Sequence, residues 1–194
     1  VITPLDTFSL DATSFEYQGK RYYLWAQKDP EIYGNSNLYL AELENAWTIK
    51  GQPVMLSKPE LEWETCGFWV NEGPAVIRRG GRVFITYSAS ATDENYCMGL
   101  LWVKDGADIL DASQWHKMQK PVFGTARHNR QFGPGHNSFT QTKEGDDVLV
   151  YHARNYTEIE GDPLYDPNRH TRIKIFAWDE QGMPVFGEPL ADNR

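Results

Sequence analysis

The chain has 194 residues, of which 40% are hydrophobic and 13% aromatic, and its formal net charge is −8. This is enough apolar material for one folded core, whereas the acidic charge argues against nucleic acid or an anionic membrane as a partner, because like charges repel. No apolar run approaches the roughly 20 residues of a membrane span.

Three segments with the same layout follow one another along the chain. They run from Asp11 to Ala26, from Glu72 to Tyr87 and from His136 to Tyr151. Each contains a short strand, a turn with glycine and an aromatic or β-branched strand, which is the pattern of a β-hairpin. The strands that follow recur as well, at 38–43, 99–104 and 172–178. The chain therefore contains a repeat of about 60 residues with four short strands.

This repeat predicts an all-β fold of the β-propeller type, because a sandwich does not repeat one four-strand order three times. The repeats cover roughly residues 8–70, 71–133 and 134–194, or about three blades. Three blades cannot close a ring, since propellers need four or more. We expect a partial propeller that is completed by an upstream segment, a second polypeptide or another copy of this chain.

A polar residue stands at the head of the innermost strand of each repeat: Asp11, Glu72 and His136. These strand ends converge around a propeller axis, so we expect two carboxyls and an imidazole to face one pocket. Close carboxylates push each other's pKa values apart, which keeps one protonated as an acid. The alternatives are solvated turn carboxylates and a structural histidine. Three aromatic side chains are candidates for stacking on a sugar there: Trp25, Phe68 and Trp69.

Other site chemistries are poorly represented. Cys66 and Cys97 are interpreted as buried apolar thiols, with a single disulfide as the alternative. The sequence has no phosphate-binding glycine loop, zinc-protease motif or Gly-x-Ser-x-Gly elbow. The acidic loop from Glu158 to Asp166 is interpreted as solvated or salt-bridged, with calcium binding as the alternative.

The most specific segments are Asn71-Glu-Gly-Pro-Ala-Val76, Tyr87-Ser-Ala-Ser-Ala-Thr-Asp93, Gly133-Pro-Gly-His-Asn-Ser138 and residues 151–172. With them the chain resembles glycoside hydrolase family 43, in particular its exo-acting α-L-arabinofuranosidases, over essentially its whole length. The resemblance implies that residues 1–194 are part of a five-bladed catalytic propeller with an inverting mechanism. A carboxylic acid then protonates the leaving oxygen, and a carboxylate about 6.5–9.5 Å away activates water.

The resemblance implies release of terminal α-L-arabinofuranosyl residues from arabinan or arabinoxylan. An inactive carbohydrate-binding remnant, a β-xylosidase and an endo-arabinanase are the alternatives. By the same resemblance Glu72 is the general acid, Asp11 tunes its pKa, and Arg172 contacts substrate. His136 orients a central water or a calcium ion, so a structural calcium near the axis is the metal implied, and no cofactor is required.

The family's general base is an Asp near the N-terminus of its first blade, and we expect it to lie outside this chain, in a missing N-terminal segment or a second polypeptide. Asp6 is a poor substitute, and neither Glu62 nor Glu64 is expected to face the axis. The insertion from Asn155 to His170 is expected to wall off one end of the pocket, which favours exo action. Since polysaccharide lies outside the cell, the resemblance implies a secreted or periplasmic protein.

Overall fold

The structure is a computed structural model that describes residue 1 and residues 3–192. Within these residues all regular structure consists of β-strands and single 3-10 turns, so the predicted all-β class is confirmed. The 3-10 turns are η1 (Glu62–Glu64), η2 (Ala112–Gln114), η3 (Arg127–Asn129) and η4 (Pro163–Tyr165). In the part of the chain that is described, no helix has the length and apolarity to cross a membrane.

The strands form consecutive antiparallel sheets. The first sheet holds β1 (Ser9–Tyr17), β2 (Lys20–Gln27), β3 (Asn37–Asn45) and β4 (Thr48–Ser57). The second holds β5 (Asn71–Arg79), β6 (Arg82–Ala89), β7 (Cys97–Lys104) and β8 (His116–Lys117). The third holds β9 (Phe132–Gln141), β10 (Asp147–Arg154) and β11 (His170–Ile175). A separate short pair joins β12 (Ala177–Trp178) and β13 (Pro184–Val185).

The predicted hairpins are present, and in two of them the backbone conformation of the turn explains why the chain reverses there. Tyr17 pairs with Lys20 across the β1–β2 turn, where Gln18 and Gly19 have φ angles of 49° and 74°. Two consecutive residues with positive φ make the two-residue turn that matches the twist of antiparallel strands. A Gly-Gly pair plays the same part between β5 and β6, with φ angles of 57° and 73°.

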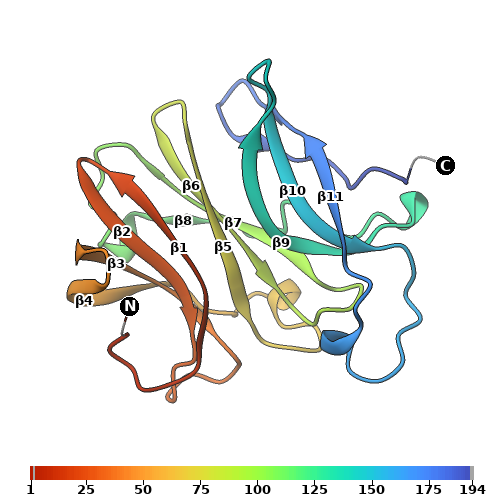
Figure 1. Cartoon of the computed structure of the whole chain (residues 1–194), viewed down its shortest axis with the longest axis horizontal. Coiled ribbons are helices and arrows are strands. Elements are labelled where there is room, and N and C mark those ends of the chain that lie inside the picture. Colours follow the sequence, from red (N-terminus) through yellow and green to blue (C-terminus); the bar gives the residue numbers. More distant parts are fainter. Residues whose placement is uncertain (2, 193–194) are drawn as a thin grey trace.

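The three large sheets stand side by side, and their first strands β1, β5 and β9 are neighbours in space (Figure 1). Between the first and second sheets lies an apolar core that includes Leu24, Leu38 and Ile85, all fully buried. A second core, which includes Leu149 and Phe186, packs the second sheet against the third. Burying each such side chain contributes about 1.5–3 kcal/mol, so the sheets hold one another through their faces.

Trp25 lies in a third core on the other face of the first sheet. Its ring is 1% exposed and stacks on Tyr39 at 5.8 Å between ring centroids. The indole N–H donates to Gln27 Oε1 at 2.8 Å, and Gln27 in turn donates to the Leu5 carbonyl, which ties the N-terminal segment over this face. No face of the ring is open to a sugar. This placement corrects the expectation for Trp25, and we leave it out of the substrate contacts proposed below.

The two cysteines are free thiols. Cys97 is buried, as predicted, and burial raises its pKa to about 12. Cys66 is only half-buried, because it lies in the connection between the first two sheets rather than in a strand, and its thiol contacts the Glu62 carbonyl.

Candidate active site

The heads of β1, β5 and β9 bring Asp11, Glu72 and His136 together. One carboxylate oxygen or imidazole nitrogen of each residue lies within 4.8 Å of those of the other two. His136 Nε2 is 3.7 Å from Asp11 Oδ1, and Asp11 Oδ2 accepts a 3.0 Å hydrogen bond from the backbone N–H of Gly73. The convergence predicted from the repeat is present.

A β-bulge creates this convergence in each of the three strands. At these bulges residues 11–12, 73–74 and 136–137 are left out of strand pairing, and β9 has a second irregularity at 133–134. The first residue of each bulge, Asp11, Gly73 or His136, has a φ angle of 52°, 56° or 48°. Glu72 therefore stands one residue before the position that Asp11 and His136 occupy, which corrects the equivalence drawn from the sequence. A bulge changes the direction in which side chains point, and here the bulges turn the heads of the three strands toward one another.

The surroundings of Glu72 raise its pKa. Burial raises the pKa of Glu72 and the carboxylate of Asp11 raises it further, although the Tyr96 hydroxyl and the charges of His136 and Arg169 act in the opposite direction. A carboxyl with a raised pKa holds its proton nearer neutral pH and can donate it during a reaction. The geometry therefore suits Glu72 to general acid chemistry.

A hollow of about 550 Å³ adjoins Glu72. Its lining includes Phe8, Phe68, Asp93, Asp162 and Leu164. Asp162 and Leu164 come from the connection between β10 and β11, the blue loop at the bottom of Figure 1, so the insertion forms one wall of the hollow, as predicted. Phe68 is 49% exposed, which leaves its ring accessible from the hollow.

The insertion is held in place by a buried arginine. Arg154, 2% exposed, donates from Nε to Asp166 Oδ1 at 2.9 Å and from its guanidinium to the Pro163 carbonyl at 2.7 Å. A further bond from Arg154 reaches the carbonyl of Thr92, in the connection between β6 and β7. One side chain thus fixes two connections that line the same hollow.

The remaining predicted contacts lie further out. Trp69 is 40% exposed and packs edge-on against Tyr33 at 4.9 Å, beside a smaller adjoining hollow that Phe68 also lines. Arg172 is on β11, and its guanidinium pairs with Asp192. The structure therefore brings Phe68 to the hollow of Glu72, but it does not bring Arg172 into the cluster.

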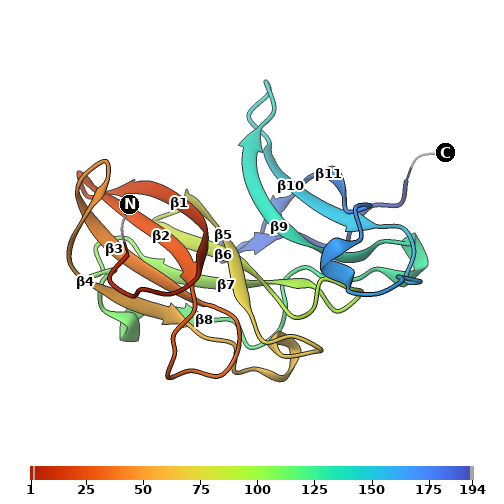
Figure 2. The same ribbon diagram turned by 60° about the horizontal axis from the view of Figure 1, so that its bottom comes forward.

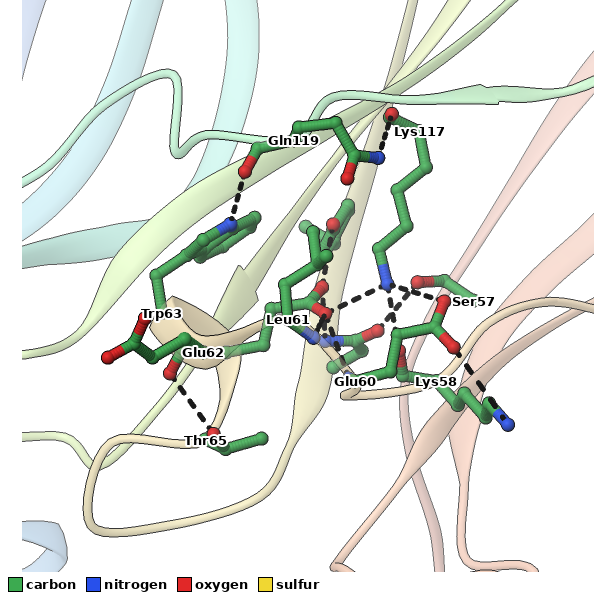
Figure 3. Close-up of polar contacts among 12 residues, drawn as sticks. Ser57, Lys58, Glu60, Leu61, Glu62, Trp63, Thr65, Lys117 and Gln119 are labelled. Carbon is green, nitrogen blue, oxygen red and sulfur yellow. Dashed lines mark hydrogen bonds and ion pairs between the residues drawn. The ribbon is translucent and has the colours of Figure 1, made fainter.

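Sequence reasoning missed a buried carboxylate behind the site. Glu64 is fully buried and accepts hydrogen bonds from Lys117 Nζ at 2.9 Å, Tyr87 Oη at 2.8 Å and Asn71 Nδ2 at 3.2 Å. Figure 3 shows Lys117 reaching toward the loop around Lys58, whose carbonyl it also contacts. Because Asn71 directly precedes Glu72, the Glu64 network fixes the backbone from which the candidate acid projects.

Calcium does not fit the cluster as a directly bound ion. Ca²⁺ takes six to eight oxygen ligands, whereas this cluster supplies two carboxylates and an imidazole nitrogen. One oxygen of each carboxylate is already engaged, Asp11 Oδ2 by the Gly73 N–H and Glu72 Oε1 by the Tyr96 hydroxyl, so the cluster offers at most two free carboxylate oxygens.

Replacing Phe68 by alanine is expected to lower kcat/KM for a substrate bound in this hollow by about tenfold. Loss of an apolar contact of this size costs on the order of 1–2 kcal/mol, which corresponds to that change in rate. Steady-state kinetics on the complete catalytic domain measure it. Trp47→Ala is the matched control, because Trp47 is 71% exposed at the β3–β4 turn. An equal loss in both variants would contradict a role for Phe68 in binding.

Two close carboxyls, one with a raised pKa, beside a hollow with accessible aromatic rings define a glycosidase-like acid site on an all-β fold. Comparison with known families agrees with this class. The model of glycosyl hydrolases family 43 matches residues 1–184, and the chain belongs to that family.

Several known proteins are similar in sequence to this chain over all or nearly all of its length. The extracellular exo-alpha-(1->5)-L-arabinofuranosidase of Streptomyces avermitilis is 53% identical over 194 residues, and alpha-L-arabinofuranosidase 43 of Humicola insolens is 54% identical over 193. These alignments cover 100% and 98% of this chain and 40% of each relative. The crystal structure of alpha-L-arabinofuranosidase from Lactobacillus brevis is 62% identical, with a TM-score of 0.98, over 100% of this chain and 60% of that one.

Proposed function

We propose that this chain is part of an inverting glycoside hydrolase that releases terminal α-L-arabinofuranosyl residues from arabinan or arabinoxylan. The observation that carries the proposal is the cluster of Asp11, Glu72 and His136, in which Glu72 has a raised pKa and adjoins a hollow. The proposal is also supported by the similar proteins, which are named arabinofuranosidases.

In the proposed mechanism Glu72 gives its proton to the glycosidic oxygen as the C–O bond breaks and the bonding pair moves to that oxygen. A water molecule that loses its proton to the general base forms the new bond to the anomeric carbon from the opposite face. Asp11 holds the pKa of Glu72 up through its nearby charge, and it fixes the bulge through the Gly73 N–H. His136 orients a water molecule at the axis, and it is the residue that would hold a calcium ion there through such water. Phe68 contacts the sugar from the wall of the hollow, and Trp69 lies beyond it.

The general base of this mechanism lies outside the 194 residues in our proposal. Among the described residues, Asp93 and Asp162 line the hollow, but each uses Oδ1 to hold the turn that it begins. Both oxygens of Glu64 are hydrogen-bonded to other side chains. Asp6 and Glu62 are exposed, and neither belongs to the cluster of close carboxylate and imidazole atoms. We therefore propose neither these groups nor any other carboxylate of this chain as the base.

We also propose that the three sheets are blades of a five-bladed propeller and that residues 1–194 are part of one catalytic domain. A further segment or a second polypeptide completes the ring and supplies the base. The share of the relatives' length that the chain spans, 40%, supports this proposal. The substrate is an arabinose-containing polysaccharide, so we propose a secreted or periplasmic location, in keeping with the extracellular relative of Streptomyces avermitilis.

Product analysis tests this function. The complete catalytic domain, incubated with linear arabino-oligosaccharides, is expected to release only arabinose, and proton NMR in the first minutes should show the anomer of inverted configuration. The 194-residue chain alone is expected to be inactive. Retained configuration would contradict the inverting mechanism, shorter oligosaccharides without arabinose would indicate an endo enzyme, and xylose from xylo-oligosaccharides would indicate a xylosidase. Binding without hydrolysis would indicate a carbohydrate-binding remnant.

Replacing Asp11 by asparagine is expected to move the alkaline limb of the pH–rate profile to lower pH. The limb reports loss of the Glu72 proton, and the charge of Asp11 is one cause of the raised pKa of Glu72. Asparagine keeps an oxygen for the Gly73 N–H, so the bulge is retained. Asp105→Asn is the control, because Asp105 pairs with Arg78 away from the cluster. A limb that stays in place would contradict the tuning role.

A further inference from the structure

Tyr96 lies against the candidate acid, although it belongs to none of the repeated strand heads. It immediately precedes β7, and its side chain is fully buried. The phenolic O–H donates to Glu72 Oε1 at 2.6 Å, a distance typical of a hydrogen bond from a hydroxyl to a carboxylate. Burial, and next to it the charge of Glu72, raises the pKa of Tyr96 well above its usual range, so the hydroxyl stays a proton donor.

The ring of Tyr96 is held from two sides. A Cβ atom added to Gly135 would lie 2.4 Å from Tyr96 Cε1, so the ring rests directly on the backbone of β9. The imidazole of His152 lies parallel to it, with ring centroids 5.5 Å apart and planes at 10°. Burial lowers the pKa of His152 to about 3, so this ring is uncharged near neutral pH. The hydroxyl therefore has little freedom to leave Glu72.

We propose that Tyr96 is the positioning residue of the general acid: it holds Oε1 of Glu72 as an acceptor, so that the transferable proton resides on Oε2, and it stabilises the carboxylate left after transfer. The inference rests on the proposed function of Glu72. A neutral carboxyl has one O–H and one acceptor oxygen, and Oε1 is the acceptor for the Tyr96 hydroxyl.

The same bond strengthens during the reaction. As the proton moves from Oε2 to the glycosidic oxygen, negative charge develops on Glu72, and a hydrogen bond to a charged group is stronger than one to a neutral group. An interaction that is stronger in the transition state than in the ground state raises kcat. Other charges face Glu72 as well: Asp11 from β1, His136 from β9 and Arg169 from the insertion. Tyr96 is the partner in direct hydrogen-bond contact with Glu72 among the described residues.

The test compares two leaving groups in the complete catalytic domain. In Tyr96→Phe we expect kcat for an arabino-oligosaccharide to fall by about 10- to 100-fold with little change in KM, because the sugar alkoxide cannot leave without a proton. Hydrolysis of p-nitrophenyl α-L-arabinofuranoside should fall much less, since p-nitrophenolate leaves unprotonated. The alkaline limb of the pH–rate profile should move to higher pH, because a donor that lowers the pKa of Glu72 is lost.

Tyr17→Phe is the matched control. Tyr17 is also buried, and its hydroxyl donates to the Ala107 carbonyl at 3.1 Å, so its loss removes a buried tyrosine hydroxyl without touching Glu72 or the Glu64 network and should leave the leaving-group ratio unchanged. If Tyr96→Phe does not fold, a difluorinated tyrosine incorporated at position 96 keeps the ring and strengthens the donor, and the alkaline limb should then move to lower pH. Equal losses on both substrates with an unmoved limb would overturn the inference.

Glu72→Gln separates this inference from the function on which it rests. If Glu72→Gln shows the leaving-group split and Tyr96→Phe does not, Glu72 is the acid and the role of Tyr96 is wrong. If the parent enzyme hydrolyses neither substrate, both proposals fail.

Discussion

Replacing Glu72 by glutamine is expected to lower kcat for arabino-oligosaccharides by at least about 10²–10⁴-fold in the complete catalytic domain, the usual cost of losing a positioned acid. Glutamine has nearly the same shape and keeps an oxygen for the Tyr96 hydroxyl. The loss should be far smaller with p-nitrophenyl α-L-arabinofuranoside, because that leaving group needs no proton. Steady-state kinetics with both substrates measure the two effects.

The loss should not come from unfolding. The pKa of Glu72 is raised in the fold, so its ionised form weakens stability as the pH rises above the pKa of the unfolded chain. Glu72→Gln removes that ionisation and should be at least as stable as the parent near neutral pH. Glu62→Gln is the control, because the Glu62 side chain is exposed and its replacement should leave activity unchanged. Activity near that of the parent in Glu72→Gln would exclude Glu72 as the acid.

Local patterns in the sequence predicted the hairpins and the convergence at their heads. Alternating strands and turn glycines are local features, and a repeat transfers them from one sheet to the next. The bulges were not predictable in this way. The repeat places Glu72 level with Asp11, but the strand pairing gives that place to Gly73, since glycine adopts the positive φ of 56° without strain.

The error at Trp25 and the omission of Tyr96 both depend on contacts between residues that are distant in the sequence. Tryptophan is a residue type that often stacks on sugar rings, so the sequence alone suggested this role for Trp25. Only the N-terminal segment, which is hydrogen-bonded to Gln27, shows that the Trp25 ring is covered. Tyr96 meets Glu72 across 24 positions, through a space that the missing side chain of Gly135 leaves open. The Gly-Pro-Gly segment at 133–135 was a signal for close backbone approach, although it did not say which residue approaches.

Replacing Glu64 by alanine is expected to lower the free energy of unfolding by about 3–5 kcal/mol, the cost of removing one partner of a buried ion pair. The Lys117 ammonium, whose side chain is 14% exposed, would lose its buried carboxylate. The hydroxyl of Tyr87 and the backbone N–H of Leu61 would lose their acceptor in the same step. Denaturant unfolding of the chain, followed by tryptophan fluorescence, measures the difference, and Glu62→Ala should change it by less than about 0.5 kcal/mol.

The large expected loss of stability in Glu64→Ala follows from the number of elements that are hydrogen-bonded to this carboxylate. Its two oxygens connect the loop before β5 with β6 and β8, and Asn71 passes the constraint to the residue beside the candidate acid. Glu64→Gln keeps one acceptor oxygen and should cost less than Glu64→Ala, whereas Lys117→Met should cost a large part of it by leaving the carboxylate unpaired. If Glu64→Ala were no more destabilising than Glu62→Ala, the loop would be held by its apolar contacts, and the position of Glu72 would not depend on this network.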